Sequence, residues 1–371
     1  MAAGDLRLRL YEAFLTYPAG QEVHTASSGR ITALHELFLA IEDRAADVRA
    51  IGEIRANIGF ITGTPDDAVL PAVRALLARL ADARSFDELS SRFAEIRRVF
   101  PKIAQALIDN TLVDLAAKRA GVPACESLGG AYRPALACNQ CVFWGSDADM
   151  RANMAIYRSH GFSKIKVRVG IGALEDDLRR LAWLRDEFGG DIALAIDANG
   201  AWSADEALSA VAQLAQFGLD YVEQPTHPGD WDALERVASS CDLLVMIDEG
   251  LQTEDDVARV CANGGLIAAH LKIAKAGGVT DMMKIGRRFD SHGVSYVTGQ
   301  MNEGAASTAI AVHAAMALAP LVSELYGALG IVNDPCEGVG YDNGLVSVRH
   351  ASGLGVSIRH DRWTLLWDSE A

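Results

Sequence analysis

Basic charge is scarce in this chain of 371 residues, because 34 Lys and Arg residues face 49 Asp and Glu residues and give a formal net charge of -15. Nucleic acids and anionic membrane surfaces are bound by clustered basic side chains, so we predict neither as a partner. Long apolar runs are also missing: none reaches membrane-spanning length, and the first residues do not read as a signal peptide. We therefore expect a cytoplasmic protein.

Cysteine is sparse as well, with six residues scattered through a chain long enough to bury a large core without disulfides. Cys138 and Cys141 form a CxxC pair, but no second pair or nearby histidine completes a zinc site. We predict reduced core cysteines. Half of the residues are hydrophobic (50%) and only 22% are charged, which excludes a disordered chain.

The first third of the chain mixes strand-like runs with helices and predicts an α+β capping domain over residues 1–130. Strand-like runs lie at 37–41 and 48–51, and Pro101 begins a helix that ends at Gly121. The polar stretch 24–29 and the glycine-punctuated stretch 52–63 are expected as loops. Loops of this kind commonly cover a functional site.

From Pro134 onward, short apolar strands alternate with amphipathic helices, a pattern that requires a parallel sheet. Eight such units make a (β/α)8 barrel. We predict an α/β fold with the barrel at 131–330, the cap at 1–130 and a C-terminal segment, 331–371, that returns to the cap. The strand candidates are 135–142, 163–167, 192–197, 219–223, 243–248, 268–273, 294–297 and a weaker one near 321–326.

Two lysines, Lys164 and Lys166, lie two positions apart on the second of these strands, so their side chains should point to the same face. Inside a barrel, two ammonium groups depress each other's proton affinity, and a lysine can then act as a base near neutral pH. A lone KxK is more often a solvated strand face. The catalytic interpretation therefore depends on the residues downstream.

Three acids, Asp197, Glu223 and Asp248, end successive strand candidates and recur about every 25 residues. Singly, such an acid is more often a helix cap, but in phase they should converge at the mouth of the barrel, where barrel active sites lie. Three close carboxylates need a divalent cation, and oxygen ligands favour Mg²⁺. One unit further, Lys272 ends the next strand and is expected across the mouth from Lys166.

This arrangement predicts proton chemistry next to a carboxylate. A substrate carboxylate bound to Mg²⁺ has its α-proton acidified, because the metal stabilises the enediolate that forms when the proton leaves. A lysine on each face can remove or deliver that proton. The expected partner is a small-molecule carboxylate substrate.

Eight motifs spread over nearly the whole chain carry a family resemblance: residues 164–166, 197–199, 222–225, 248–249, 271–278, 301–304, 324–327 and 353–356. With them the chain resembles the enolase superfamily and, within it, the mandelate racemase/muconate lactonizing enzyme family, in particular the muconate cycloisomerase subgroup. Enolase-type sites generally combine a Lys or His base with Mg²⁺. The resemblance implies a homo-oligomer and a cap that places two loops, near 21–28 and 55–62, over the barrel mouth.

By this resemblance, Lys166 and Lys272 are the acid/base pair, Lys164 assists near the substrate carboxylate, and three carboxylates hold Mg²⁺. Asn199 would support the site, and Glu303 matches an acid at the end of the seventh strand. The metal ligands are then Asp197, Glu223 and Asp248, and the substrate-binding candidates are Arg55, Asn57, Ile58, Phe60, Trp144, Asn199, Met301 and Glu303.

The chain departs from the resembled subgroups at three places. Gly327-Ala328-Leu329-Gly330 stands where muconate cycloisomerases tend to carry Gly-Pro-Leu-Leu, and Arg55 stands at an otherwise uncharged position. Glu324-Leu325-Tyr326 replaces the paired aspartates of dipeptide epimerases, which argues against dipeptides. The sequence thus predicts a Mg²⁺-dependent, cycloisomerase-like isomerase. The alternatives are a racemase or epimerase of an amino or imino acid derivative, an acid-sugar or hydroxy-acid dehydratase, and a non-catalytic protein on the same fold.

Overall fold

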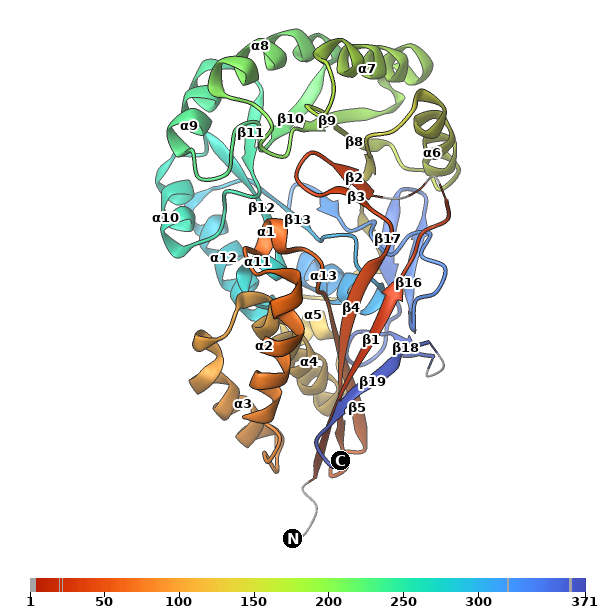
Figure 1. Ribbon diagram of the computed structural model, residues 1–371, viewed down its shortest axis with the longest axis vertical. Coiled ribbons are helices and arrows are strands. Elements are labelled where there is room, and N and C mark those ends of the chain that lie inside the picture. The colour runs from red at the N-terminus through yellow and green to blue at the C-terminus, as the bar shows by residue number, and fades with distance from the viewer. Residues whose placement is uncertain (1–4, 20, 22, 319, 360–361) are drawn as a thin grey trace.

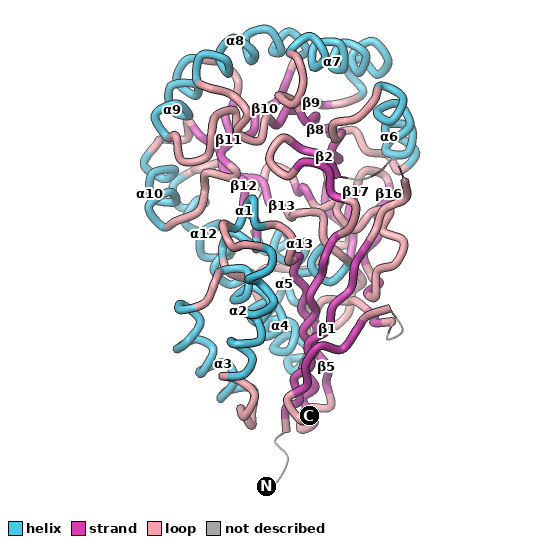
Figure 2. The backbone as a smooth tube through the Cα atoms, viewed as in Figure 1, coloured by secondary structure: helices cyan, strands magenta, loops and turns pink. Residues whose placement is uncertain are grey.

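The computed structural model describes residues 5–371 apart from 20, 22, 319 and 360–361. Figures 1 and 2 show strands ringed by helices in the upper part and a long antiparallel sheet with helices beside it in the lower part. None of the described helices is long and apolar enough to cross a membrane.

The lower part is the cap, whose sheet has the strand order β19-β1-β4-β5 with antiparallel neighbours. Buried and partly exposed residues alternate along much of β1, so one face of the strand packs into the core. The last strand of the chain, β19, pairs with β1 and so returns to the cap. The elements are β1 (Leu6–Leu15), β4 (Leu34–Asp43), β5 (Val48–Arg55), β19 (Thr364–Asp368), α1 (Gly59–Thr62), α2 (Asp66–Ala78), α3 (Phe86–Ile96), a 3-10 turn (Arg97–Val99), α4 (Lys102–Ala120) and α5 (Ala124–Ser127).

The upper part is an eight-stranded parallel sheet in which β7 to β14 lie in sequence order. A parallel bridge from Cys138 to Ser323 joins its first and last strands, so the expected (β/α)8 barrel is confirmed. The strands are β7 (Gln140–Val142), β8 (Lys164–Arg168), β9 (Ala193–Asp197), β10 (Leu219–Glu223), β11 (Leu244–Ile247), β12 (Ile267–Lys272), β13 (Tyr296–Gly299) and β14 (Ser323–Glu324). The helices are α6 (Asp147–Ser159), α7 (Leu174–Phe188), α8 (Ala204–Leu214), α9 (Trp231–Ser240), α10 (Glu254–Ala262), α11 (Ile273–Ala276), α12 (Val279–His292) and α13 (Ala305–Ala317), with 3-10 turns at Gly189–Asp191 and Ala215–Phe217.

Helix starts follow the expected side-chain signals. Ser203 and Glu206 form the predicted capping box of α8, and Thr253 with Asp256 forms another at α10. Two expectations were wrong. The stretch 52–63 is not a plain loop, since β5 runs to Arg55 and α1 follows, and the expected strand 135–142 is split into β6 (Leu136–Ala137) and β7.

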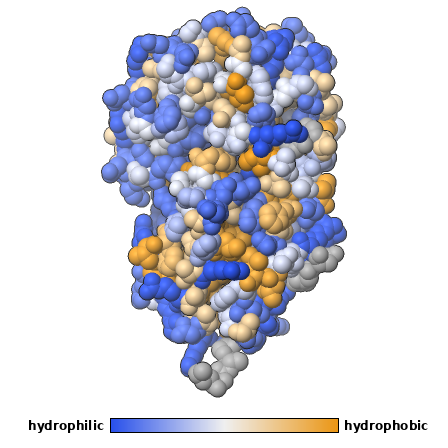
Figure 3. All heavy atoms as spheres, viewed as in Figure 1, coloured by the Kyte–Doolittle hydropathy of each residue, from blue (hydrophilic) through white to orange (hydrophobic). Residues whose placement is uncertain are grey.

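Smaller sheets complete the structure. β2 (Val23–Thr25) and β3 (Gly29–Ile31) form a hairpin that lies in front of the barrel in Figure 1. β16 (Val339–Asp342), β17 (Leu345–Val348) and β6 form one sheet, and β15 (Cys336–Glu337) pairs with β18 (Ser357–Ile358). Figure 3 shows hydrophilic residues over the outer barrel helices and larger hydrophobic areas over the cap.

A cluster of buried acids lies where the cap meets the barrel. Glu36 and Glu53 come from cap strands, Glu303 follows β13, and Asp334 lies in the C-terminal segment. Burial, with repulsion among the acids, raises the pKa of Glu36 and Glu53 well above the usual range and that of Asp334 to about 6. Within the part of the chain that the structure describes, neither carboxyl oxygen of Glu36 has a hydrogen-bond partner.

This cluster predicts a loss of stability on the alkaline side. A carboxyl whose pKa is raised by folding binds more protons when folded, so the free energy of unfolding falls as pH rises from about 5 toward 8. We expect Glu36→Gln to raise the free energy of unfolding more at pH 8 than at pH 5, because the amide cannot ionise in its buried position. Denaturant unfolding at pH 5 and 8 measures this. An equal effect at both pH values would contradict it.

Candidate active site

The three predicted acids meet at the carboxyl ends of adjacent strands. Asp197 and Glu223 are the last residues of β9 and β10 and lie opposite each other in the strand register, and Asp248 directly follows β11. All three side chains are at most 1% exposed. The sequence therefore predicted correctly that these carboxylates converge.

Cationic side chains contact each of these carboxylates. The Lys166 Nζ donates to Glu223 Oε2 at 2.8 Å and to Glu324 Oε1 at 2.7 Å, and it lies 3.3 Å from Asp197 Oδ2. On the other side, the Lys272 Nζ donates to Asp248 Oδ2 at 2.5 Å and the Lys275 Nζ to Asp248 Oδ1 at 2.7 Å. The two predicted acid/base lysines thus lie on opposite sides of the acid group.

Arg168, which the sequence analysis did not single out, also reaches the mouth. It ends β8 in register with Asp197, pairs with Asp197 Oδ2, and lies 3.3 Å from Asn199 Oδ1. The alternation that puts Lys164 and Lys166 on one face of the strand extends to Arg168. Lys164, Lys166 and Arg168 therefore form a row from the amino end to the carboxyl end of β8.

The predicted position of Lys164 was wrong. Lys164 is the exposed first residue of β8 and lines a cavity with Ala193, Leu244 and Val322, which lie at or near the amino ends of their strands. Barrel mouths open at the carboxyl ends of the strands. Lys164 therefore lies at the far end of the barrel and does not assist near a substrate carboxylate.

The predicted mutual lowering of lysine pKa was wrong too. Burial alone would lower the pKa of Lys166, but the carboxylates of Glu223 and Glu324 outweigh it and raise this pKa above its usual value. Burial would likewise raise the pKa of Glu223, yet Lys166 and His270 hold it well below the usual range. Fully buried Lys166 is thus a charged partner of the acids.

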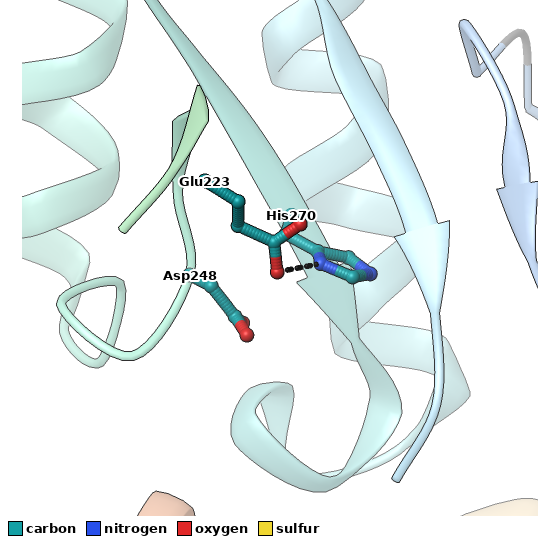
Figure 4. A group of neighbouring side chains, drawn as sticks. All are labelled: Glu223, Asp248 and His270. Carbon is teal, nitrogen blue, oxygen red and sulfur yellow. Dashed lines mark hydrogen bonds and ion pairs between the residues drawn. The ribbon is translucent and has the colours of Figure 1, made fainter. Parts of the chain in front are cut away.

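His270 is a second residue that the sequence analysis missed. It lies two positions before Lys272 on β12, and its Nδ1 is 2.8 Å from Glu223 Oε1. Figure 4 marks this contact with a dashed line. A Cβ on Gly299 of the neighbouring strand would lie 1.9 Å from His270 Nε2, so this glycine makes room for the ring. The contact between His270 and Glu223 depends on the packing of neighbouring strands, which the sequence alone does not show.

The residues present fit a divalent cation. Glu223, Asp248 and His270 offer ligand atoms within 4.8 Å of one another, and Asp197 adds a carboxylate from the adjoining strand. Glu249 follows Asp248 in the chain, and no described residue forms a hydrogen bond with its buried Oε2. Burial and the charge of Asp248 raise the pKa of Glu249, so added positive charge would be favourable there.

Cap loops cover the mouth and leave a free volume of about 30 Å³. Four of the substrate-binding candidates, Arg55, Phe60, Asn199 and Met301, line it. Arg55 is nonetheless 1% exposed and donates from Nη1 to the Met301 carbonyl at 2.6 Å, so it joins the cap to the loop after β13. Residues of the β2–β3 hairpin and the barrel also line the mouth, namely Val23, Thr25, Ser27, Ser28, Phe143 and Gln300.

The other four candidates do not line this mouth. Ile58 is fully buried in the core, and Asn57 is bonded within the cap, where its Nδ2 donates to the Ala33 carbonyl at 2.9 Å. The Arg180 guanidinium lies 5.1 Å from the ring centre of Trp144. Glu303 belongs to the buried acid cluster, because its loop turns toward Arg55.

The fold and the site together define a barrel enzyme with a carboxylate-and-lysine centre at the carboxyl ends of its strands. Residues 149–362, more than half of the chain, match the family described as enolase C-terminal domain-like. The chain belongs to this family and thus to the enolase superfamily, as its motifs predicted.

Individual relatives are isomerases. The chain is 26% identical over 260 residues, 70% of each protein, to the N-succinyl-L-Arg/Lys racemase of Bacillus cereus. It is 27% identical over 268 residues to muconate cycloisomerase 1 of Acinetobacter baylyi, covering 70% of this chain and 72% of that protein. The structure of a dipeptide epimerase from Cytophaga hutchinsonii, complexed with Mg and the dipeptide D-Ala-L-Val, superposes with a TM-score of 0.87 at 24% identity, covering 97% of this chain and 98% of that one. This likeness supports the barrel-and-cap fold.

Proposed function

We propose that the protein is a Mg²⁺-dependent isomerase that moves one proton at the carbon next to a substrate carboxylate, in the manner of a cycloisomerase. The observation that carries this proposal is the asymmetry of the mouth. Lys272 lines it from β12, whereas Arg168 lines it from β8. These strands are the second and sixth of eight, so the two side chains approach the mouth from opposite sides.

Arg168 is unsuited to carry a proton. A guanidinium stays protonated at any physiological pH. Burial would lower the pKa of Arg168, but neighbouring acidic groups, Glu324 and Glu223 among them, raise it further above its usual value. Lys166 lies beneath Arg168, is 0% exposed and is bonded to Glu223 and Glu324. Proton transfer is therefore assigned to Lys272 alone.

The chain's own residues divide the remaining tasks. Asp197, Glu223 and Asp248 would hold Mg²⁺, which supplies the positive charge that stabilises an enediolate. Lys272 holds or delivers the proton at its Nζ, and Lys275 fixes Asp248. Arg168 keeps a fixed positive charge on the other face. The cap loops line the mouth and leave only about 30 Å³ of free volume there, which limits the access of water.

The second candidate is a racemase or epimerase, which the names of several relatives favour. Racemisation by two bases needs a proton carrier on each face of the enediolate. Arg168 on the second face argues against a racemase, because a guanidinium does not carry protons. A cycloisomerase, or a dehydratase that eliminates a β-hydroxyl, needs a proton carrier only on the Lys272 face. A racemase therefore exchanges protons on two faces of the enediolate, and these other enzymes on one.

Isotope exchange tests the proposal. We expect wild-type protein with Mg²⁺ in D₂O to exchange the α-proton of only one enantiomer of any accepted chiral carboxylate, measured by NMR across a carboxylate library. Arg168→Lys places a titratable amine on the second face and should add exchange of the other enantiomer. Arg168→Met keeps the bulk without the amine and should not. Wild-type exchange of both enantiomers would overturn the one-lysine proposal in favour of a racemase.

A further inference from the structure

A second cavity opens at the amino-terminal end of the barrel, opposite the mouth. It has a volume of about 220 Å³. Lys164, Ala193 and Leu244 line it as the first residues of β8, β9 and β11, and Val322 lines it just before β14. Buried Lys166 lines the cavity too, but the cavity and the mouth share none of their lining residues.

Small side chains create this space. Barrel interiors are normally filled by layers of bulky branched residues. Here β9 contributes Ala193 and Ala195, and the inner cluster that Ala195 joins also contains Ala268. Tyr221 and Val322 form apolar walls. An apolar cavity of about 150 Å³ holds a benzene ring, so this one is large enough for a ring with substituents.

Two buried polar residues, Asn139 and Lys166, line the cavity together with two exposed charged residues. Asn139 is 3% exposed; its Nδ2 donates to Glu324 Oε2 at 2.8 Å, whereas its Oδ1 has no hydrogen-bond partner among the described residues. A buried acceptor without a donor costs about 1–3 kcal/mol, so a ligand that donates to it gains affinity. Exposed Lys164 lies at the rim, and exposed Asp220 lies there too. The rim therefore suits a single negative charge better than two.

We propose that this cavity binds a small cyclic monocarboxylate that carries a hydrogen-bond donor at the end opposite its carboxylate. The carboxylate contacts the Lys164 ammonium, the ring lies against Ala193, Ala195 and Tyr221, and the donor reaches Asn139 Oδ1. This site is independent of the proposed function, because none of its contacts uses the mouth.

Occupancy of the cavity has a direct route to the catalytic acids. Asn139 holds Glu324, Glu324 accepts from Lys166 at 2.7 Å, and Lys166 donates to Glu223 at 2.8 Å. A ligand that donates to Asn139 Oδ1 would therefore add a contact to the side chain that already holds Glu324.

Binding of 4-hydroxybenzoate to the full chain tests the proposal by calorimetry and ligand-observed NMR. Benzoate lacks the donor and 4-hydroxybenzamide lacks the charge, so both should bind more weakly. We expect Lys164→Gln to weaken 4-hydroxybenzoate binding by about threefold or more, as loss of an exposed ion pair does. Ala193→Leu, at the partly exposed rim, should fill the cavity and abolish binding with an unchanged circular dichroism spectrum.

The mouth also accepts carboxylates in the proposed function, so the two sites must be separated. Lys272→Ala alters the mouth and should leave 4-hydroxybenzoate binding at the cavity unchanged. Absence of binding to wild type, or binding that survives both Lys164→Gln and Ala193→Leu, would overturn the cavity proposal. Neither result bears on α-proton exchange, which is measured separately.

Discussion

Replacement of Lys272 by alanine is expected to lower kcat by at least about 10³-fold and to abolish α-proton exchange of every accepted carboxylate. Among the described residues that line the mouth, Lys272 is the one lysine. Its Nζ donates a hydrogen bond to Asp248 Oδ2. With Arg168 on the other face, no second group takes over the proton. Turnover and deuterium uptake of the purified variant measure the effect.

Two matched variants separate proton transfer from charge. Lys272→Arg keeps the positive charge beside Asp248 but not a titratable amine, so it should lose exchange almost as fully as the alanine variant. Lys284→Ala removes a surface lysine of α12 that pairs with Asp281, and should leave kcat unchanged. Exchange that persists in Lys272→Ala would assign the proton to another group.

The sequence was sufficient for the barrel and for its acid group because both depend on periodic placement. One acid per βα unit fixes Asp197, Glu223 and Asp248 to the same end of the sheet, whatever the details of packing. Alternation along β8 also correctly placed Lys164 and Lys166 on one face. What it could not decide was which residue of the row lies level with the acids, because that depends on where the strand ends.

The position at which β8 ends decides which side chain faces the mouth, and therefore which residues can transfer a proton. If the strand had ended near Lys166, a lysine would face the mouth from β8; since it continues to Arg168, a guanidinium does. Continuing the alternation by one more step would have found Arg168. His270 is different, since its place depends on the space beside Gly299 on the neighbouring strand. No period in the sequence indicates such a contact.

The contacts of long side chains in the cap loops could not be predicted from the sequence either. Arg55 was predicted as a substrate-binding residue because the family resemblance places its loop over the barrel mouth, but it ends β5 and is hydrogen-bonded to Asn57 and to the Met301 carbonyl. A buried arginine with these contacts fixes the cap to the barrel. Its neighbour Phe60, 38% exposed at the mouth, is better placed to contact a substrate.

Substitution of Glu223 by glutamine is expected to lower kcat by at least about 10²-fold and to weaken Mg²⁺ binding measurably. Glu223 lies between Asp197 and Asp248 in the strand order and contributes to the group of close ligand atoms. The amide keeps the shape of the side chain and removes the charge that a hard cation requires. Calorimetric titration with Mg²⁺, and melting with Mg²⁺ or EDTA, report on the metal independently of turnover.

Loss of Glu223 also removes a partner of buried Lys166, and an uncompensated buried charge is destabilising. Glu324→Gln provides the control, because Glu324 contacts the same Lys166 Nζ at 2.7 Å and is not a proposed metal ligand. If the carboxylates hold Mg²⁺ as proposed, both variants lower the melting temperature, but only Glu223→Gln lowers the Mg²⁺ affinity. Equal Mg²⁺ affinity in the two variants and the wild type would mean that Glu223 serves Lys166 and His270 rather than the metal.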